Sequence, residues 1–171
     1  MKHYQYYVEG QDERNLLTEL KTKMRLIQPG KIQVLNVIQN NIRDSHLMQL
    51  KDNTVVVFVF DTDKEGGTTL DKNIALCKQH EKVREVLCIP QVKNLEDELI
   101  RSCNISQIIE LLPSRSLSNF KTDFAKEKKL KEKLEKKNFD IRTFWSQIPD
   151  DDYKHISNDA DKIKIIPKDG R

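Results

Sequence analysis

The sequence contains little cysteine, histidine or glycine. Among 171 residues there are three cysteines, four histidines and five glycines. Cys77, Cys88 and Cys103 form no CxxC pair, which argues against a zinc knuckle and a thioredoxin-type site. Each lies in an apolar pattern that is typical of a small buried side chain in a reducing cytoplasm. The scattered histidines show no metal-ligand spacing, so we expect them to be surface residues.

Long apolar runs are also missing. No segment approaches the roughly 20 apolar residues that span a bilayer, and the N-terminal stretch MKHYQYYVEG has no apolar core of a signal peptide. We therefore expect no membrane partner and a cytoplasmic location. The net charge of +3 is too small to indicate nucleic-acid binding by itself.

The N-terminal half alternates between the two secondary-structure periodicities. β-branched and apolar runs follow one another with amphipathic stretches between them. This order predicts an α/β fold: a Rossmann-like, mainly parallel four-stranded sheet with helices on both faces. The expected strands are residues 3–8, 32–38, 54–60 and 83–90, the last stopped by Pro90, and the expected helices are 11–24, 42–53 and 66–80, the last opened by a Thr68–Asp71 capping pair.

Beyond Pro90 the pattern becomes helical. Short amphipathic helices are expected at 94–103 and 105–112, followed by a long exposed helix at 116–139 whose drifting apolar stripe would cover the core only loosely. The tail is polar from Asp150 onward, and KIKII at 162–166 is a candidate edge strand. The chain thus divides into an α/β domain at 1–113 and a basic helical extension at 114–171, unless the two form one continuous domain.

Acidic residues close two of the expected strands. The first strand ends in Glu9, and the third, VVVFVF, runs into Asp61 and Asp63. Ligands of open α/β sheets bind at the carboxyl ends of the strands, and carboxylates that meet there repel one another unless a cation lies between them. Oxygen ligands select Mg²⁺ or Mn²⁺. The glycines beside these acids would let a phosphate approach the backbone: Gly10, Gly66 and Gly67.

A simpler interpretation is that Asp61 and Asp63 only cap the next helix and begin a turn. A lone Asp-x-Asp would favour that interpretation. Here the motif closes an apolar strand while a second strand ends in Glu-Gly, and this combination favours a metal site for phosphoryl transfer.

These residues resemble the TOPRIM domain, which occurs in topoisomerases, bacterial primases and small nucleases, including OLD-type proteins. The family pattern is a strand, Glu-Gly and an acid three residues after the Glu, then a strand ending Asp-x-Asp-x-x-Gly. The matching residues, within roughly residues 1–90, are Glu9, Gly10, Asp12, Asp61, Asp63 and Gly66. The resemblance implies that Glu9 is a metal ligand or a general acid/base and that Asp61 and Asp63 hold Mg²⁺, with Asp12 near a second ion.

Within that family, several branches do not suit this chain. It has no room for the further domains of a topoisomerase, its cysteines supply no primase zinc module, and it has no GxxxxGK[ST] motif of an ATPase. What remains is a metal-dependent nuclease that cleaves DNA or RNA alone or with a separately encoded ATPase. The alternative is a non-catalytic binding subunit, or a toxin or phage-defence effector, acting with such an ATPase.

Two further elements fit a nuclease. Glu96 and Glu98 follow the fourth strand, where similar nucleases place a carboxylate for a second metal; which of the two faces inward is open, and both also suit a helix N-terminus. Such nucleases use a lysine to stabilise the transition state, and Lys121, between two aromatic residues, is the candidate.

The segment 114–142 carries ten Lys or Arg against five Asp or Glu. This is either a solvated helix with i,i+4 ion pairs or a phosphate-backbone clamp beside the acidic site. Trp145, the only tryptophan, is expected to be a core residue rather than a base-stacking platform. The candidate clamp residues are Lys126, Lys128, Lys129 and Lys133.

Overall fold

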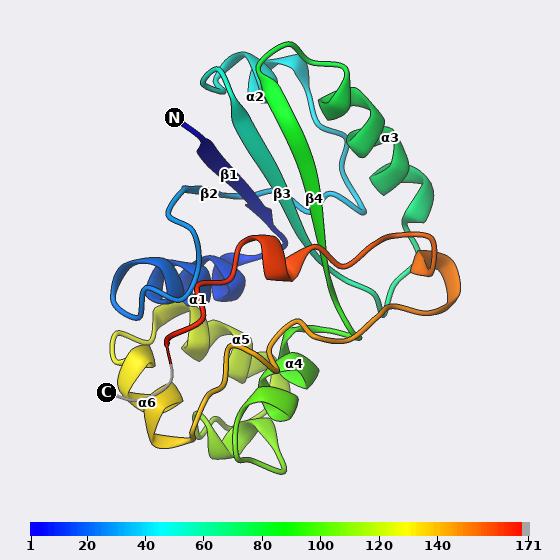
Figure 1. The fold of residues 1–171 in the computed structure, drawn as a ribbon. Helices are drawn as coiled ribbons and strands as arrows, with labels where there is room; N and C mark the ends of the chain where they lie inside the picture. The colour runs from blue at the N-terminus through cyan, green and yellow to red at the C-terminus, as the bar shows by residue number, and fades with distance from the viewer. Residues whose placement is uncertain (169–171) are drawn as a thin grey trace.

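The core of the protein is a four-stranded sheet in which every strand pair is parallel (Figure 1). The computed structural model describes residues 1–168. The spatial order is β2-β1-β3-β4, so the first and third strands are neighbours. The α/β class and parallel sheet expected from the sequence are confirmed. The strands are β1 (His3–Val8), β2 (Lys31–Val34), β3 (Thr54–Asp61) and β4 (Val83–Gln91).

Helices cover both faces of this sheet. Alternate residues of β3 point to opposite faces, so Val55, Val57 and Val59 belong to one buried cluster and Val56, Phe58 and Phe60 to the other. The first cluster packs against α1, α4, α5 and α6, and the second against α2 and α3. The helices are α1 (Gln11–Thr22), α2 (Asp44–Met48), α3 (Gly67–Lys78), α4 (Leu95–Ser102), α5 (Leu117–Lys126) and α6 (Leu130–Lys136), with 3₁₀ turns η1 (Ile108–Glu110), η2 (Asp151–Tyr153) and η3 (Ala160–Lys162).

The segment expected as one long helix forms two helices, α5 and α6, and the second expected short helix is only the 3₁₀ turn η1. α5 ends because the Asn15 side-chain amide donates to the carbonyl oxygens of Phe124 and Glu127, which satisfies two of the carbonyls left open at the helix end. The apolar stripe does not cover the core loosely, as the sequence suggested. Phe120, Phe124, Leu130 and Leu134 are all buried in the first cluster. Residues 114–140 therefore share a core with the sheet.

Two local expectations were wrong. β4 does not stop at Pro90 but continues to Gln91, with Pro90 aligned to Phe60; β4 is at the edge of the sheet, where a missing N–H leaves no neighbour unpaired. α3 begins at Gly67 with Gly66 at its N-cap and no side-chain cap, so the Thr68–Asp71 capping pair does not form.

The tail that looked polar packs against the sheet. Tyr153 and Ile156 are buried in the second cluster and Ile163 in the first. The KIKII segment adds no strand to the sheet; it makes one antiparallel bridge, between Ile27 and Lys164. In the part of the chain that the structure describes, no helix is both long and apolar enough to cross a bilayer.

Candidate functional site

Glu9 and Asp61 meet at the carboxyl end of the sheet. β1 and β3 are adjacent and parallel, so the residue after β1 and the last residue of β3 lie at one rim. The Asp61 backbone N–H donates to Glu9 Oε2 at 3.3 Å. Asp61 is buried, with 3% of its surface exposed. The sequence prediction that these two carboxylates converge is therefore confirmed in space.

The environment of Asp61 disfavours its ionised form. Burial, followed by the charges of Glu9 and Asp63, raises the pKa of Asp61 to about 8, although Gln91 and Lys121 oppose this shift. Gln91 Nε2 donates to Asp61 Oδ1 at 2.7 Å, and Trp145 Nε1 donates to Gln91 Oε1 at 3.2 Å. Trp145, buried as expected for a core residue, thus holds the amide that orients Asp61.

Two more carboxyl groups come from the first turn of α1. Asp12 and Glu13 are both buried, and burial together with Asp12 and Asp61 raises the pKa of Glu13. Glu13 Oε2 also accepts the Gly10 N–H at 2.8 Å, as in a capping box. Sequence reasoning placed Asp12 at this rim but missed Glu13. The capping-box spacing, Gly10 followed three residues later by Glu, was the available signal.

Asp63 lies farther out, on the loop that follows β3. It is exposed, and Asn94 Nδ2 donates to its Oδ2 at 3.3 Å. The loop is fixed from two sides: the Lys64 ammonium lies 4.0 Å from Glu9 Oε1, and the Tyr153 hydroxyl donates to the Lys64 carbonyl oxygen at 2.5 Å. Asp63 therefore borders the rim at a fixed loop, within reach of solvent.

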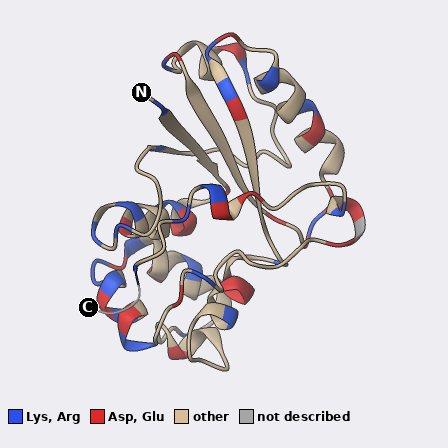
Figure 2. Cartoon of the chain, in the orientation of Figure 1, with Lys and Arg blue, Asp and Glu red and all other residues tan. Residues whose placement is uncertain are grey.

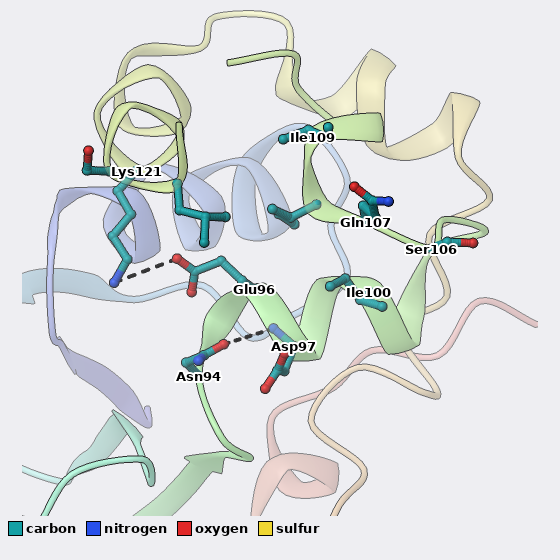
Figure 3. A pocket seen from close by; sticks show the side chains of 11 residues that line it. Asn94, Glu96, Asp97, Ile100, Ser106, Gln107, Ile109 and Lys121 are labelled. Atoms are coloured by element: carbon teal, nitrogen blue, oxygen red, sulfur yellow. Dashed lines mark hydrogen bonds and ion pairs between the residues drawn. The ribbon is translucent and has the colours of Figure 1, made fainter. Parts of the chain in front are cut away.

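Lys121 reaches the rim from α5. Its ammonium lies 3.7 Å from Glu96 Oε1, and Figure 3 shows the two side chains extending toward each other from α5 and α4. Burial lowers the pKa of Lys121, but Glu96, Asp12, Asp61 and Glu13 raise it by more, so the shift is upward. A protonated lysine thus stands among the carboxylates, as the sequence predicted.

Glu98 has a different role from Glu96. It is fully buried, and its carboxylate accepts the backbone N–H groups of Val92 (2.9 Å) and Trp145 (3.0 Å) and pairs with Arg101 at 2.9 Å. Both oxygens are engaged with the chain itself. The choice that the sequence left open is therefore decided by position: Glu96 faces the rim, while Glu98 ties β4 and α4 to the segment around Trp145.

The three glycines differ in what surrounds them. A Cβ at Gly10 would lie 2.7 Å from Asp12 Oδ1, so this glycine opens directly onto the acidic rim. A Cβ at Gly66 would lie 2.6 Å from the Ile38 carbonyl oxygen, which means that chain packing already requires a glycine there. Gly67 is less constrained, its Cβ position lying 3.4 Å from the Asp152 carbonyl oxygen. Of the three, Gly10 is therefore the one whose Cβ position lies against the rim carboxyl groups.

The predicted lysine clamp is not beside the acids. The Lys23 ammonium, one residue beyond α1, donates to the Lys128 carbonyl oxygen at 3.3 Å. Since Asp12 lies in the first turn of α1, the length of that helix puts the two regions about 16 Å apart. Figure 2 shows Lys and Arg interspersed with Asp and Glu around α6, and Lys133 pairs with Glu127 at 3.8 Å. Of the predicted basic residues, Lys121 is the one that pairs with a rim carboxylate. Lys126 lies between Phe124 and Glu127, whose carbonyls accept from Asn15 in the first half of α1, and the Lys128 backbone lies at the C-terminal end of that helix, followed by Lys129 and Lys133.

The chemistry of the rim suits a hard divalent cation. Its donors are carboxylate oxygens, and burial together with the charges of Glu9 and Asp63 raises the pKa of Asp61, so that a bound cation would favour the ionised form of this residue. In residues 1–168, no three His, Cys, Asp or Glu side chains are arranged to hold a metal ion by themselves. Mg²⁺ seldom needs such a cage, because one or two carboxylates with water and substrate phosphates complete its coordination. Glu9 and Asp61, with Asp63 nearby, match that mode of binding.

Comparison of the chain with protein-family models, curated proteins and solved structures gave no match. The function is therefore inferred from the geometry of the rim and from its chemistry.

Proposed function

We propose that the protein is a Mg²⁺- or Mn²⁺-dependent nuclease of the TOPRIM type, which hydrolyses phosphodiester bonds of DNA or RNA. The observation that carries this proposal is the rim itself. Carboxyl groups from the end of β1, from α1 and from β3 converge there with Lys121, and burial and the charges of Glu9 and Asp63 raise the pKa of Asp61. The resemblance of the Glu-Gly and Asp-x-Asp motifs to the TOPRIM pattern supports the same conclusion.

Each residue of the rim has a distinct part in this reaction. Glu9, Asp61 and Asp63 would hold the primary cation, and Asp12 and Glu96 would help to place a second. A bound cation would activate water and stabilise the charge on the phosphate oxygens. Gln91 fixes the orientation of Asp61, and Glu13 holds the Gly10 backbone in place.

Lys121 supplies the positive charge that a substrate phosphate needs. Without it, the carboxylates would repel the incoming backbone. Its ammonium, now 3.7 Å from Glu96, can donate to a non-bridging oxygen as negative charge builds up on the phosphate. The lysines that follow Lys121 along the chain (Lys126, Lys128, Lys129 and Lys133) would contact the phosphate backbone on either side of the cleaved bond.

Cleavage of labelled single-stranded DNA and RNA with Mg²⁺ or Mn²⁺ tests the proposal. Asp61→Asn and Glu9→Gln should each lower kcat by roughly a hundredfold or more, because each removes charge from the cation site. Asp52→Asn is the matched control: this exposed aspartate lies just before the opposite end of β3 and should leave the rate unchanged. Full activity in either rim variant, or no cleavage by the wild type of either substrate, contradicts the proposal.

Thermal unfolding provides a second readout that does not require turnover. A cation that binds only the folded protein raises its melting temperature, so millimolar Mg²⁺ should stabilise the wild type and Asp52→Asn but not Asp61→Asn. A wild type that binds metal yet cleaves nothing by itself would favour the alternative function, a subunit that works with a separately encoded ATPase. Gel filtration with the candidate partner would then show a stoichiometric complex.

A further inference from the structure

A pocket of about 660 Å³ opens beside the rim, between α4, η1 and α5 (Figure 3). Its size is within the roughly 300–1,000 Å³ typical of ligand pockets. Apolar atoms form most of its wall surface, although polar and charged side chains stand among the isoleucines and the leucine that line it. The lining residues used below are Glu96, Ile100, Gln107, Ile109, Leu117 and Lys121.

The walls of this pocket expose large apolar side chains. Leu117 is 66% exposed and Ile109 is 42% exposed. Apolar surface gathered around a concavity is typical of a binding site. Gln107, whose side-chain amide has both donors and an acceptor, supplies a polar group on the same lining.

The pocket is continuous with the acidic rim. Glu96 and Lys121 line the pocket, and they are also the two rim residues whose side chains lie 3.7 Å apart. In Figure 3 their ion pair lies at one side of the pocket, with Ile109 and Gln107 across from it. A phosphate held at the rim by Lys121 would therefore have its neighbouring nucleoside next to the apolar walls.

We propose that this pocket receives the base of a nucleotide adjoining the cleaved phosphate, and that the substrate is single-stranded at that point. The inference rests on the proposed function for the position of the phosphate. Apolar side chains such as Leu117, Ile109 and Ile100 can pack against the flat faces of any base, and the Gln107 amide can pair with a base edge of either polarity. A base inside a duplex is stacked and paired, so it must be unstacked to enter.

The test measures binding of a fluorescein-labelled oligothymidylate by anisotropy, with Ca²⁺ in place of Mg²⁺. The double variant Ile109→Asn/Leu117→Asn should bind roughly tenfold more weakly, since contacts between a base and a packed side chain are of that order. The control is Ile148→Asn, which changes another exposed isoleucine (80% exposed) that does not line the pocket, and it should bind like the wild type.

A second arm moves one abasic nucleotide along the oligothymidylate. One position should weaken binding to the wild type roughly tenfold but leave binding to the double variant almost unchanged, because both changes remove the same contact. Equal affinity at every abasic position, or additive losses, overturns the inference. These arms require no cleavage: a rim variant that stays active would refute the nuclease while leaving the binding result intact, and active enzyme with no abasic effect would refute the pocket alone.

Discussion

At the scale of single residues, Asp61 is where the strands, the helices and the tail all act on one carboxyl group. Glu9 supplies repulsion, Gln91 supplies a hydrogen bond, and burial removes the water that would otherwise stabilise the charge. A carboxyl group in this setting is stabilised by binding either a proton or a cation. Its protonation is therefore tied to the stability of the fold as well as to metal binding.

The stability of the metal-free protein should consequently fall as the pH rises. The pKa of Asp61 is raised from an ordinary value near 3.8 to about 8, so its contribution is fully present below about pH 4 and is lost as the pH approaches 8. In EDTA, Asp61→Asn should therefore melt above the wild type at pH 8 and close to it at pH 4.5. Differential scanning calorimetry measures both temperatures, with Asp52→Asn as control. An Asp61→Asn variant that melts lower than the wild type at pH 8 contradicts the raised pKa.

The two glutamates of α4 provide a second prediction at this scale. Glu98→Gln should lower the free energy of unfolding by about 1–3 kcal/mol, because an amide cannot accept both backbone N–H groups and neutralise Arg101. Glu96→Gln breaks only a partly exposed pair with Lys121 and should cost less than about 1 kcal/mol. Urea unfolding measures both values.

Metal titrations should rank the same two variants in the opposite order, with the larger loss of metal-induced stabilisation in Glu96→Gln. Glu96→Gln should reduce the stabilisation by Mn²⁺, whereas Glu98→Gln should keep it, since only Glu96 faces the rim. If Glu98→Gln removes the metal effect at full stability, the buried carboxylate is a ligand after all.

At the scale of elements, the two glycines at the start of α3, Gly66 and Gly67, differ in how tightly the chain packs around them. Gly66→Ala should destabilise the protein by roughly 1–3 kcal/mol, because its Cβ would lie 2.6 Å from the Ile38 carbonyl oxygen and its φ of 157° suits glycine. Gly67→Ala, one residue later, meets only an ordinary contact and gains helix propensity, so its stability should stay within about 0.5 kcal/mol of the wild type or rise. Chemical denaturation compares the two. Equal effects of both substitutions would show that the backbone at Gly66 yields readily.

Helix patterns in the sequence predicted elements better than their ends. The spacing of Phe120, Phe124, Leu130 and Leu134 indicated helix correctly, but it could not show the break between α5 and α6. That break depends on Asn15, more than 100 residues away in sequence. Likewise, the placement of the basic residues followed from the packing of α5 beside α1, which no charge pattern reveals.

At the scale of the whole molecule, the tail after Pro149 is part of the fold. Tyr153, Ile156 and Ile163 are buried on the two faces of the sheet, and Asp159 accepts the Cys88 N–H at 2.9 Å. Burial of each large apolar side chain contributes about 1.5–3 kcal/mol, and the sum approaches the 5–15 kcal/mol stability of a whole domain.

A chain truncated after Pro149 should therefore lack cooperative thermal unfolding. It should also lose the metal-induced stabilisation, because the Tyr153 contact that holds the Lys64 loop is removed. Calorimetry and near-UV circular dichroism test this. As control, a chain ending at Ile166 keeps every buried tail residue that the structure describes and should unfold like the full protein. A truncated chain that still melts cooperatively would show that the domain folds without the tail.

The sequence by itself determined the parallel α/β order and the buried third strand, whereas the meeting of Glu9 with Asp61 also required β1 and β3 to be neighbours, which the structure shows. The first two follow from local rules, since strand periodicity and the crossover geometry of parallel sheets depend on residues close in sequence. Only the tertiary structure decided that Glu13 joins the rim, that Glu98 is engaged by the chain itself, and that Lys121 and Lys64 reach the acids. Those outcomes depend on which side chains, far apart in sequence, lie close together in the folded protein. The effects of burial and of neighbouring charges depend on separation in space and not on separation along the chain.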